Sequence, residues 1–519
     1  MSVKLFTIGD SISQGFMSGA AAKTDQCYST LLAKILEAQN YCFPEWSKGG
    51  LPLDLETVFR RLERRLDTNI SGPFEWIKAT AIINSYLDEV EDYYERGDGC
   101  LSKSLGKNAY HNVSVRGFDI SNSWQLTPGL CEEYIKKSND NGDNFFGVVN
   151  EALHRTAFKV LGSGNADNPS KYKNYTQLDW LQQHHKNEGV ENVILWLGAN
   201  NALGTVTNLK IKQTSPDGTA FLKGPDKVSY KERKENDWNL WHPEDFRVEY
   251  QYMMDQVIKI MESNPDKKDY KVFVATIPLV TICPLIKAVE SYGRTMIEVT
   301  EWIVDAANPA PMGVGQLGGR TKEPVSYGKY YPYFLFEDTF DITLKHLNQR
   351  DILHIDNCIR MYNRIIQEIV AEANERVGKP KFYLVDIATA LNQMALKRNN
   401  NNPPYEYPSY FEFCHPRVDS RYYGVTRKKE IKSGGLFSLD GVHPTAIGHG
   451  LIAYEFLKVM KKAGSFSGFP EAAIDWKAVF ESDTLYSNPI GLLGEIYDNA
   501  NFKEWIYKRI EDSWEHKKY

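Results

Sequence analysis

Short apolar runs rich in β-branched residues recur along the chain, and a loop and then a helical pattern follow each of them. Five of these runs predict β-strands, at residues 3–8, 112–115, 193–197, 271–277 and 382–386. Apolar positions at helical spacing predict crossover helices at residues 28–38, 243–261, 358–376 and 446–462. Strands that alternate with helices form right-handed βαβ units. The pattern therefore predicts an α/β fold with a five-stranded, mostly parallel sheet that helices cover on both faces.

The spacing between the predicted strands is uneven, which indicates long insertions. We expect insertions at about residues 41–110, 201–241 and 306–343, the first of which contains strong helical patterns at 53–66 and 74–96. No internal repeat, low-complexity block or Pro/Gly/Ser-rich linker divides the chain. We therefore expect one domain over residues 1–464, with a helical extension over 465–519 packed on it. Loops of this length commonly form lids or substrate walls.

Composition narrows the class of protein. The 519 residues carry 61 basic and 67 acidic side chains, a net charge of −6, which is unlike a nucleic-acid binder. The seven cysteines are scattered and form no C-x-x-C pair, so neither a zinc site nor a disulfide framework is indicated. No H-E-x-x-H, EF-hand or P-loop motif occurs, so we expect no metal and no other cofactor.

The chain shows no signal for membrane insertion or secretion. The longest apolar stretch, residues 272–286, is too short to span a bilayer and contains Pro278 and Pro284. The first predicted strand begins within three residues of Met1, which leaves no room for a signal peptide. We therefore expect a cytoplasmic protein without a membrane span.

The clearest chemical signal is Gly9-Asp10-Ser11, at the end of the first predicted strand. Open α/β sheets bind their ligands at the carboxyl ends of the strands, so a serine at this turn lies where chemistry is expected. Serine becomes a nucleophile only beside a general base and an oxyanion site. The tripeptide alone is a common turn, so the rest of the chain has to supply the general base and the oxyanion site.

Three further segments contain residues of the required types. They are Asn112-Val-Ser-Val-Arg-Gly117, Gly198-Ala-Asn-Asn201 and Asp440-Gly-Val-His-Pro444. Each alone has a simple structural interpretation, as a strand end, a turn or a helix cap. In this order along the whole chain, the four segments resemble the SGNH (GDSL-type) hydrolases, a family of esterases and lipases. The resemblance covers the core elements and neither the insertions nor the C-terminal extension.

The resemblance implies a flavodoxin-like three-layer α/β/α sandwich and a role for each matched residue. Ser11 would be the nucleophile, His443 the general base, and Asp440 the residue that orients the imidazole. The oxyanion hole would combine the backbone N–H groups of Ser11 and Gly117 with the side-chain amide of Asn200.

Two features depart from the family pattern. The third segment commonly ends in aspartate where this chain has Asn201, so we expect altered loop hydrogen bonding rather than lost activity. Gly49 and Gly50 lie at the more usual distance from Ser11 and compete with Gly117 for the oxyanion role. Gly117 is preferred because it follows a strand-like run.

Several other side chains have open roles. Arg116 either contacts a carboxylate or phosphate of the substrate or pairs with a surface acid. His184 and His185 lie in a polar stretch and are expected to be solvated. His449 is expected to be packed in the interior, whereas His415 lies near His443 in sequence and is a candidate for lining the pocket.

The sequence thus predicts a serine hydrolase that cleaves a carboxylic ester, of the esterase or lipase type, through an acyl-enzyme. The substrate would be a small-molecule ester, either an acyl lipid or an acylated sugar. A carbohydrate O-deacetylase with the same triad, an acyltransferase with another acceptor and a catalytically silent binding module on the same fold remain alternatives. The oligomeric state is open.

Overall fold

The computed structural model describes residues 2–496 apart from several gaps. The gaps fall at residues 22, 67–72, 102, 104, 139–148, 165–169, 265–268, 290–294, 303–319, 328, 333–345 and 400. Most of the predicted insertion at 306–343 and residues 497–519 of the C-terminal extension lie outside the described residues. The strands β8 (Arg320–Tyr327) and β9 (Lys329–Pro332) are the described part of that insertion.

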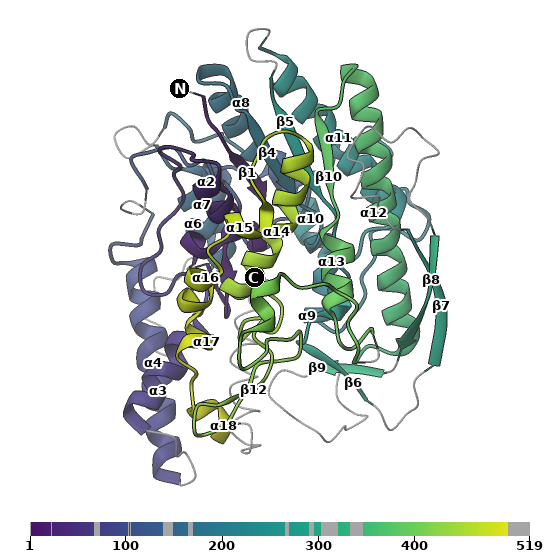
Figure 1. Cartoon of the computed structure of the whole chain (residues 1–519). Helices are drawn as coiled ribbons and strands as arrows, with labels where there is room; N and C mark the ends of the chain where they lie inside the picture. The colour runs from purple at the N-terminus through teal and green to yellow at the C-terminus, as the bar shows by residue number, and fades with distance from the viewer. Residues whose placement is uncertain are drawn as a thin grey trace.

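Four parallel strands form the central sheet in the order β1-β4-β5-β10 (Figure 1). Their bounds are β1 Phe6–Gly9, β4 Asn192–Trp196, β5 Lys271–Ala275 and β10 Phe382–Val385. In register, Phe6 lies beside Val193, and Val193 lies beside Val272. The strands are buried on both faces, which explains why they read as continuous apolar runs. The prediction of an α/β fold with a mostly parallel sheet is confirmed.

The predicted fifth strand at residues 112–115 is wrong, because the sheet has four strands. The segment runs along β1 and makes one isolated parallel bridge, between Thr7 and Asn112. The amides of Val113 and Val115 donate to the carbonyls of Thr7 and Gly9, at 3.0 and 3.2 Å. The Val113 carbonyl, however, accepts from the Gln177 side chain at 2.7 Å. This carbonyl is the acceptor that the next bond of a parallel ladder with β1 would use, so the segment borders the sheet as a loop.

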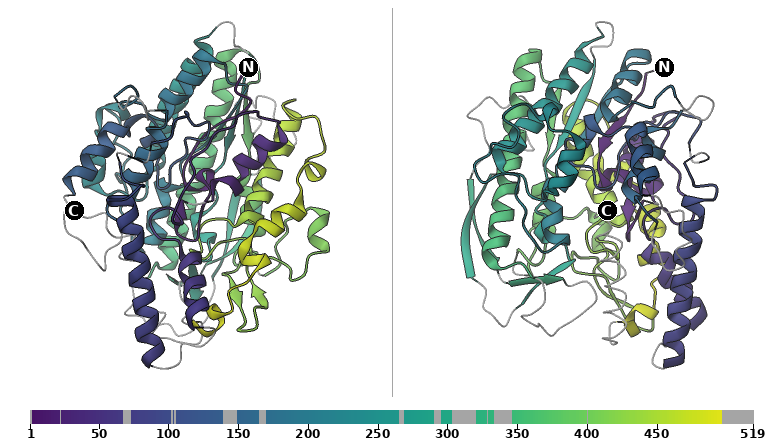
Figure 2. Two further views of the ribbon diagram at one scale, coloured as in Figure 1. Left: turned by 90° about the vertical axis from the view of Figure 1, so that its left-hand side faces the viewer. Right: turned by 180° about the vertical axis from the view of Figure 1, so that it is seen from behind.

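Helices cover both faces of the sheet. On one face the strands pack against α8 (Gln177–Asn187), α11 (Pro243–Glu262) and α12 (Gln349–Val377). On the other face they pack against α2 (Tyr28–Ile35) and α14 (Ala446–Lys462). Alternate residues of β4 separate the two layers, since Val193 and Leu195 face the first group and Ile194 and Trp196 the second. The side and reverse views in Figure 2 show the strands between these helices.

The four predicted crossover helices are all present. Helix α14 begins and ends at the predicted residues. Thr445 fixes its start by accepting the Gly448 amide. Helix α12 begins at Gln349, earlier than predicted, since Asn348 and Asp351 form a capping box there. An Asn-x-x-Asp sequence before an apolar pattern is a recognisable start signal, which the periodicity alone does not reveal.

The insertions carry short elements and one long helical pair. In the first insertion, α3 (Leu55–Leu66) and α4 (Pro73–Glu95) project away from the sheet, as the purple pair of Figure 1 shows. The second insertion contains α9 (Asn200–Thr207) and α10 (Tyr230–Asn236). The other helices of five or more residues before the extension are α6 (Pro128–Lys137), α7 (Ala152–Leu161) and α13 (Ile387–Met394). Beyond the sheet, β6 (Ile286–Val289) pairs with β9, and β7 (Thr295–Trp302) with β8.

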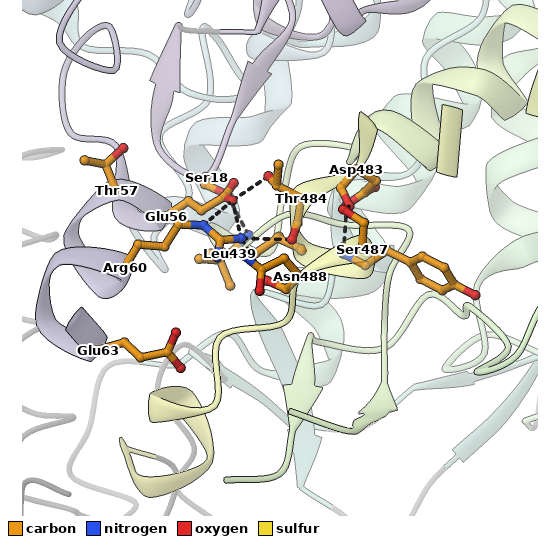
Figure 3. Close-up of polar contacts among 12 residues, drawn as sticks. Ser18, Glu56, Thr57, Arg60, Glu63, Leu439, Asp483, Thr484, Ser487 and Asn488 are labelled. Atoms are coloured by element: carbon orange, nitrogen blue, oxygen red, sulfur yellow. Dashed lines mark hydrogen bonds and ion pairs between the residues drawn. The ribbon is translucent and has the colours of Figure 1, made fainter. Parts of the chain in front are cut away.

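The described part of the C-terminal extension packs on the rest of the chain. It comprises α15 (Pro470–Ala473), α16 (Trp476–Ser482), α17 (Thr484–Ser487) and α18 (Leu492–Ile496). Arg60 of α3 donates to the carbonyls of Thr484 and Asn488, at 2.8 and 3.0 Å. Glu56 accepts from both Arg60 and the Thr484 hydroxyl (Figure 3). The extension is therefore bound to α3 through polar contacts.

A buried ion pair joins the second insertion to the core. Arg233 of α10 donates to Glu249 of α11, and both side chains are almost fully buried. Trp241 also donates to Glu249, at 2.8 Å. Burial raises the pKa of Glu249 to about 7, although the Arg233 charge opposes this shift. The carboxylate therefore depends on its arginine to remain ionised inside the protein.

Removal of the arginine should destabilise the fold. In Arg233→Met the Glu249 carboxylate stays buried without its cation, so at pH 8 the free energy of unfolding should fall by about 3–5 kcal/mol. Urea unfolding measures the change. Lys477→Met is the control, because Lys477 pairs with Glu481 on the surface and its loss should change stability by less than about 1 kcal/mol. An equally small change in both variants would contradict the prediction.

Candidate active site

Ser11 lies at the carboxyl end of β1, where the chain turns directly into the short helix α1 (Ser11–Gln14). Asp10 caps this helix by accepting the Ile12 amide at 3.1 Å. Gly9 permits the tight turn, since a β-carbon at this position would lie 2.3 Å from the Ser13 hydroxyl. Ser11 is the first residue of the helix, so its N–H has no partner within the helix. The turn thus holds the hydroxyl and an amide donor of one residue together.

Asp440 and His443 occupy a single loop before α14. The Asp440 carboxylate accepts the amides of Val442 and His443 through Oδ1, at 2.9 and 2.8 Å. Its Oδ2 accepts from Nδ1 of the His443 ring at 2.9 Å. The spacing of three positions between Asp440 and His443 therefore places carboxylate and imidazole on one turn.

The structure brings Ser11 to the same imidazole. Nε2 of His443 lies 2.9 Å from the Ser11 hydroxyl oxygen, across 432 positions of sequence. Because an ionised Asp440 can only accept, the ring carries its proton on Nδ1 and leaves Nε2 to accept the serine proton. Ser11, His443 and Asp440 are all buried, so these hydrogen bonds form in a place of low dielectric.

A two-residue hairpin completes the environment of Asp440. Strands β2 (Phe16–Met17) and β3 (Ala20–Ala21) are joined by Ser18-Gly19, both with positive φ, as a type I′ turn requires. The Gly19 amide donates to Oδ2 of Asp440 at 2.9 Å. The Ser18 amide donates to the Ser438 hydroxyl at 2.8 Å, and the Ser18 hydroxyl accepts the Leu439 amide at 3.2 Å. The turn therefore fixes the positions of Ser438, Leu439 and Asp440.

The carboxylate of Asp440 is held in its charged form. Burial acts to raise its pKa, but the charge of His443 and the hydrogen bonds from the His443 ring and nearby amides more than offset it. The net effect is a pKa below the ordinary value of 3.8. Asp440 thus remains an acceptor for Nδ1 at all pH values at which proteins ordinarily work.

Asn200 follows β4 and faces the same end of the sheet. Its amide Nδ2 donates to the Phe118 carbonyl at 2.9 Å and to Oδ2 of Asp10 at 3.3 Å. Both amide hydrogens are thus directed at protein groups in this structure. The bond to Asp10 is the longer of the two, so an oxyanion beside Ser11 would compete with Asp10 for that hydrogen.

Gly117 lies between residues that are bonded to the site. The preceding amide, that of Arg116, donates to the side-chain oxygen of Gln14 at the end of α1, at 2.9 Å. The following carbonyl, that of Phe118, accepts from Asn200. Gly117 has a φ of +74°, which favours glycine. Its neighbours connect it to both α1 and Asn200.

Gly49 and Gly50 have a different setting. The Gly50 amide donates to the carbonyl of Ser47, at 3.1 Å. A β-carbon on Gly49 would contact Asp54 and the hydroxyl of Tyr86, on and beside the α3–α4 pair. Of the two candidates for the second oxyanion amide, the geometry favours Gly117.

An apolar pocket of about 50 Å³ lies beside Ser11 and His443. Ser11, Asn200 and His443 belong to its lining. The apolar part of the lining comes from five separate segments and includes Ile12, Leu203, Leu279, Ile282, Leu391 and Phe437. The pocket therefore has space for a short apolar group beside the serine.

Sequence reasoning missed several members of the site. It did not identify Gly19 as a partner of Asp440, nor Phe16, whose ring centroid lies 4.5 Å from that of His443. Ser18-Gly19 between apolar residues is a hairpin signal that could have revealed the turn. The pocket residues after β5 carry no comparable signal, since an apolar loop reads like any core segment.

The histidine predictions had mixed outcomes. The prediction that His184 and His185 are solvated is wrong, because both are buried, and His184 packs against the Phe6 ring. Their polar neighbours on α8 face outward while the two rings face the core. His449 is buried as predicted, and His415 is exposed and absent from the pocket lining. Asn201 accepts the Ile120 amide at 3.2 Å, so its side chain connects two loops of the site.

Three comparisons with known proteins, by family models, curated sequences and solved structures, find no match to this chain. Within the described residues, no group of three or more His, Cys, Asp or Glu side chains is arranged to hold a metal ion. None of the helices in that same part of the chain combines the length and apolar character that crossing a bilayer requires. The function of this protein is therefore inferred from the geometry of the site.

Asp10 gives the site a pH-dependent stability. Burial raises its pKa to about 7 from 3.8, while the Ile12 amide and the charge of His443 act in the opposite direction. Between about pH 4 and 7 the folded protein keeps a proton on Asp10 that the unfolded chain releases. Protonated Asp10 therefore stabilises the fold at low pH, and the free energy of unfolding decreases as pH rises from about 4 to 7.

Asp10→Asn should remove this pH dependence, because an amide is neutral throughout. At pH 8 the variant should be more stable than the wild type by up to about 4 kcal/mol, and at pH 4 the two should be similar. Urea unfolding at both pH values measures the difference. Asp98→Asn, on the exposed surface, should show no such trend, and an equal difference at both pH values for Asp10→Asn would contradict the prediction.

Proposed function

We propose that this protein is a serine hydrolase of carboxylic esters and a member of the SGNH family. The observation that carries the proposal is the continuous hydrogen-bonded chain from Ser11 through His443 to Asp440, with both spacings at 2.9 Å. The three residues come from opposite ends of the sequence and converge at the carboxyl edge of a parallel sheet, where such folds bind ligands. The position of residues 112–115 along β1 also supports a flavodoxin-like order, with this segment at the place of an edge strand.

Acylation follows from the proton positions. Nε2 of His443 takes the Ser11 proton while the serine oxygen attacks the ester carbonyl carbon and forms the new C–O bond. Asp440 stabilises the imidazolium that results, since it already accepts from Nδ1. The tetrahedral intermediate then collapses, the bond to the alcohol oxygen breaks, and His443 returns the proton to the departing alkoxide.

Water completes the cycle in reverse order. His443 removes a proton from water, the hydroxide oxygen bonds to the acyl carbon, and the proton passes to the Ser11 oxygen as the acid leaves. The overall reaction consumes one ester and one water and gives one acid and one alcohol. No redox step is involved.

The negative charge on the carbonyl oxygen needs donors beside Ser11. The Ser11 amide at the start of α1, the Gly117 amide and the Asn200 side chain are the candidates that lie around this turn. Asn200 is available once the oxyanion replaces Asp10 as acceptor. The raised pKa of Asp10 supports this exchange, because a protonated Asp10 is the weaker acceptor.

The small pocket favours a short acyl group over a long one. A volume of about 50 Å³ accommodates a few carbon atoms beside Ser11. An acetyl-type ester therefore fits better than a fatty acyl ester. This supports the esterase and deacetylase interpretations over that of a lipase.

Turnover of p-nitrophenyl esters from acetate to palmitate tests the proposal. The wild type should hydrolyse the shortest esters fastest, and Ser11→Ala should abolish turnover, because it removes the attacking oxygen. Ser482→Ala is the matched control, since Ser482 donates to the carbonyl of Val479 on α16. Release of p-nitrophenol is followed by absorbance.

Labelling with a fluorophosphonate addresses an enzyme too selective for these esters. Covalent label on Ser11, identified by mass spectrometry, would show an activated nucleophile even without turnover. If neither turnover nor labelling is observed, the proposal is refuted and a catalytically silent binding module remains.

Loss of the Asn200 amide should slow the chemical step. In Asn200→Ala one oxyanion donor is absent, so kcat should fall by about 10²- to 10³-fold with little change in KM. Steady-state kinetics on p-nitrophenyl acetate measure both constants. Asn236→Ala, at the exposed end of α10, is the control, and an unchanged kcat in Asn200→Ala would exclude this side chain from the oxyanion site.

A further inference from the structure

Arg116 places its guanidinium group against Phe16, the aromatic side chain that also packs on His443. Its Cζ atom lies 5.4 Å from the centroid of the Phe16 ring, and the same ring lies 4.5 Å from the His443 ring centroid. The cation and the catalytic imidazole therefore contact the same aromatic side chain. The backbone of Arg116 is fixed as well, because its amide is bonded to Gln14, the last residue of the helix that Ser11 begins.

The charge of Arg116 has no counter-ion among the described residues. The side chain is half-buried, and desolvation alone shifts its pKa, lowering it to about 10. Other buried arginines are paired, Arg233 with Glu249 and Arg398 with Asp356. A partly desolvated charge without a partner is unfavourable, and a bound anion would offset that cost.

The cation lies outside the apolar pocket. Neither Arg116 nor Phe16 belongs to the lining of the pocket. The two arms of an ester leave its carbonyl carbon in different directions. When the acyl arm fills the pocket, the alcohol arm extends out of it, along the rest of the site that Ser11 and His443 border.

We propose that Arg116 binds an anionic group on the alcohol part of the substrate, so that the enzyme acts on short-acyl esters of phosphorylated or carboxylated alcohols. The proposal deepens the proposed function and rests on it. A guanidinium presents a planar set of donors that matches phosphate and carboxylate equally. The shared chemistry is a single anion a few bonds from the ester oxygen, held while Ser11 attacks.

Four acetate esters that differ in one terminal group test the inference. They are 2-acetoxyethyl phosphate, 3-acetoxypropionate, the neutral 2-acetoxyethanol and the cationic acetylcholine. Because a hydrogen bond to a charged group contributes about 1.5–3 kcal/mol, the wild type should hydrolyse at least one anionic ester with a kcat/KM about 10- to 100-fold above the neutral one. The two anionic esters distinguish phosphate from carboxylate.

Arg116 variants assign the preference. Arg116→Gln should lose it while the rate on 2-acetoxyethanol stays the same, and Arg116→Glu should favour acetylcholine. Arg417→Gln, on an exposed loop, should behave as the wild type. An unchanged ratio in Arg116→Gln, or an equal loss on all four esters, would overturn the inference.

Binding to Ser11→Ala gives a readout that does not need catalysis. Titration calorimetry with 2-hydroxyethyl phosphate should show binding that Ser11→Ala/Arg116→Gln lacks. Equal binding of inorganic phosphate would indicate a site for the free ion and overturn the substrate role. Arg116-dependent binding without turnover of any ester would refute the proposed hydrolase activity and support the anion site. Turnover without anion preference and without anion binding would support the hydrolase activity and refute the anion site.

Discussion

The site depends on one buried carboxylate. Asp440 is fully buried, and a charge in that position is tolerable only if its acceptor sites are satisfied. Four donors satisfy them: the amides of Gly19, Val442 and His443 and the His443 ring. The bond from the Gly19 amide also connects the carboxylate to a hairpin near the start of the chain. The contacts that stabilise the charged carboxylate are therefore the same ones that position the imidazole beside Ser11.

The sheet supplies the rest of the frame. Gly9, Trp196 and Ala275 end neighbouring parallel strands, so the loops that follow them meet at one edge. Ser11, Asn200 and the pocket wall from Leu279 to Ile282 come from these loops. The apolar recess lies along this sheet edge, and Arg116 lies outside it, against Phe16 of the hairpin. Under the proposed function, this difference suits an ester whose two halves differ in polarity.

The sequence predicted those parts of the molecule whose signals are local. The apolar runs of β4 and β5 and the Thr445 cap of α14 are visible along the chain, and so is the D-x-x-H spacing of Asp440 and His443. The failures depend on tertiary packing. Residues 112–115 have the composition of a strand, yet the Gln177 side chain occupies a backbone carbonyl that a ladder with β1 would use. His184 and His185 lie among polar residues, and only the rotation of α8 against the sheet reveals that they point inward. The approach of Gly19 to Asp440 joins positions far apart in sequence, which no periodicity encodes.

The hydrogen bond between Ser11 and His443 closes a loop of 432 positions. A ribosome that adds about 5–20 residues per second needs roughly 20–90 s to make that stretch. During most of this time Ser11 is already outside the ribosome, but His443 has not been synthesised. Under the proposed function, a nascent chain therefore contains an ordinary serine, which becomes reactive only when the last loop before α14 emerges and docks on the hairpin. Termination of synthesis before His443 would then give a product that has Ser11 and lacks the base proposed to activate it.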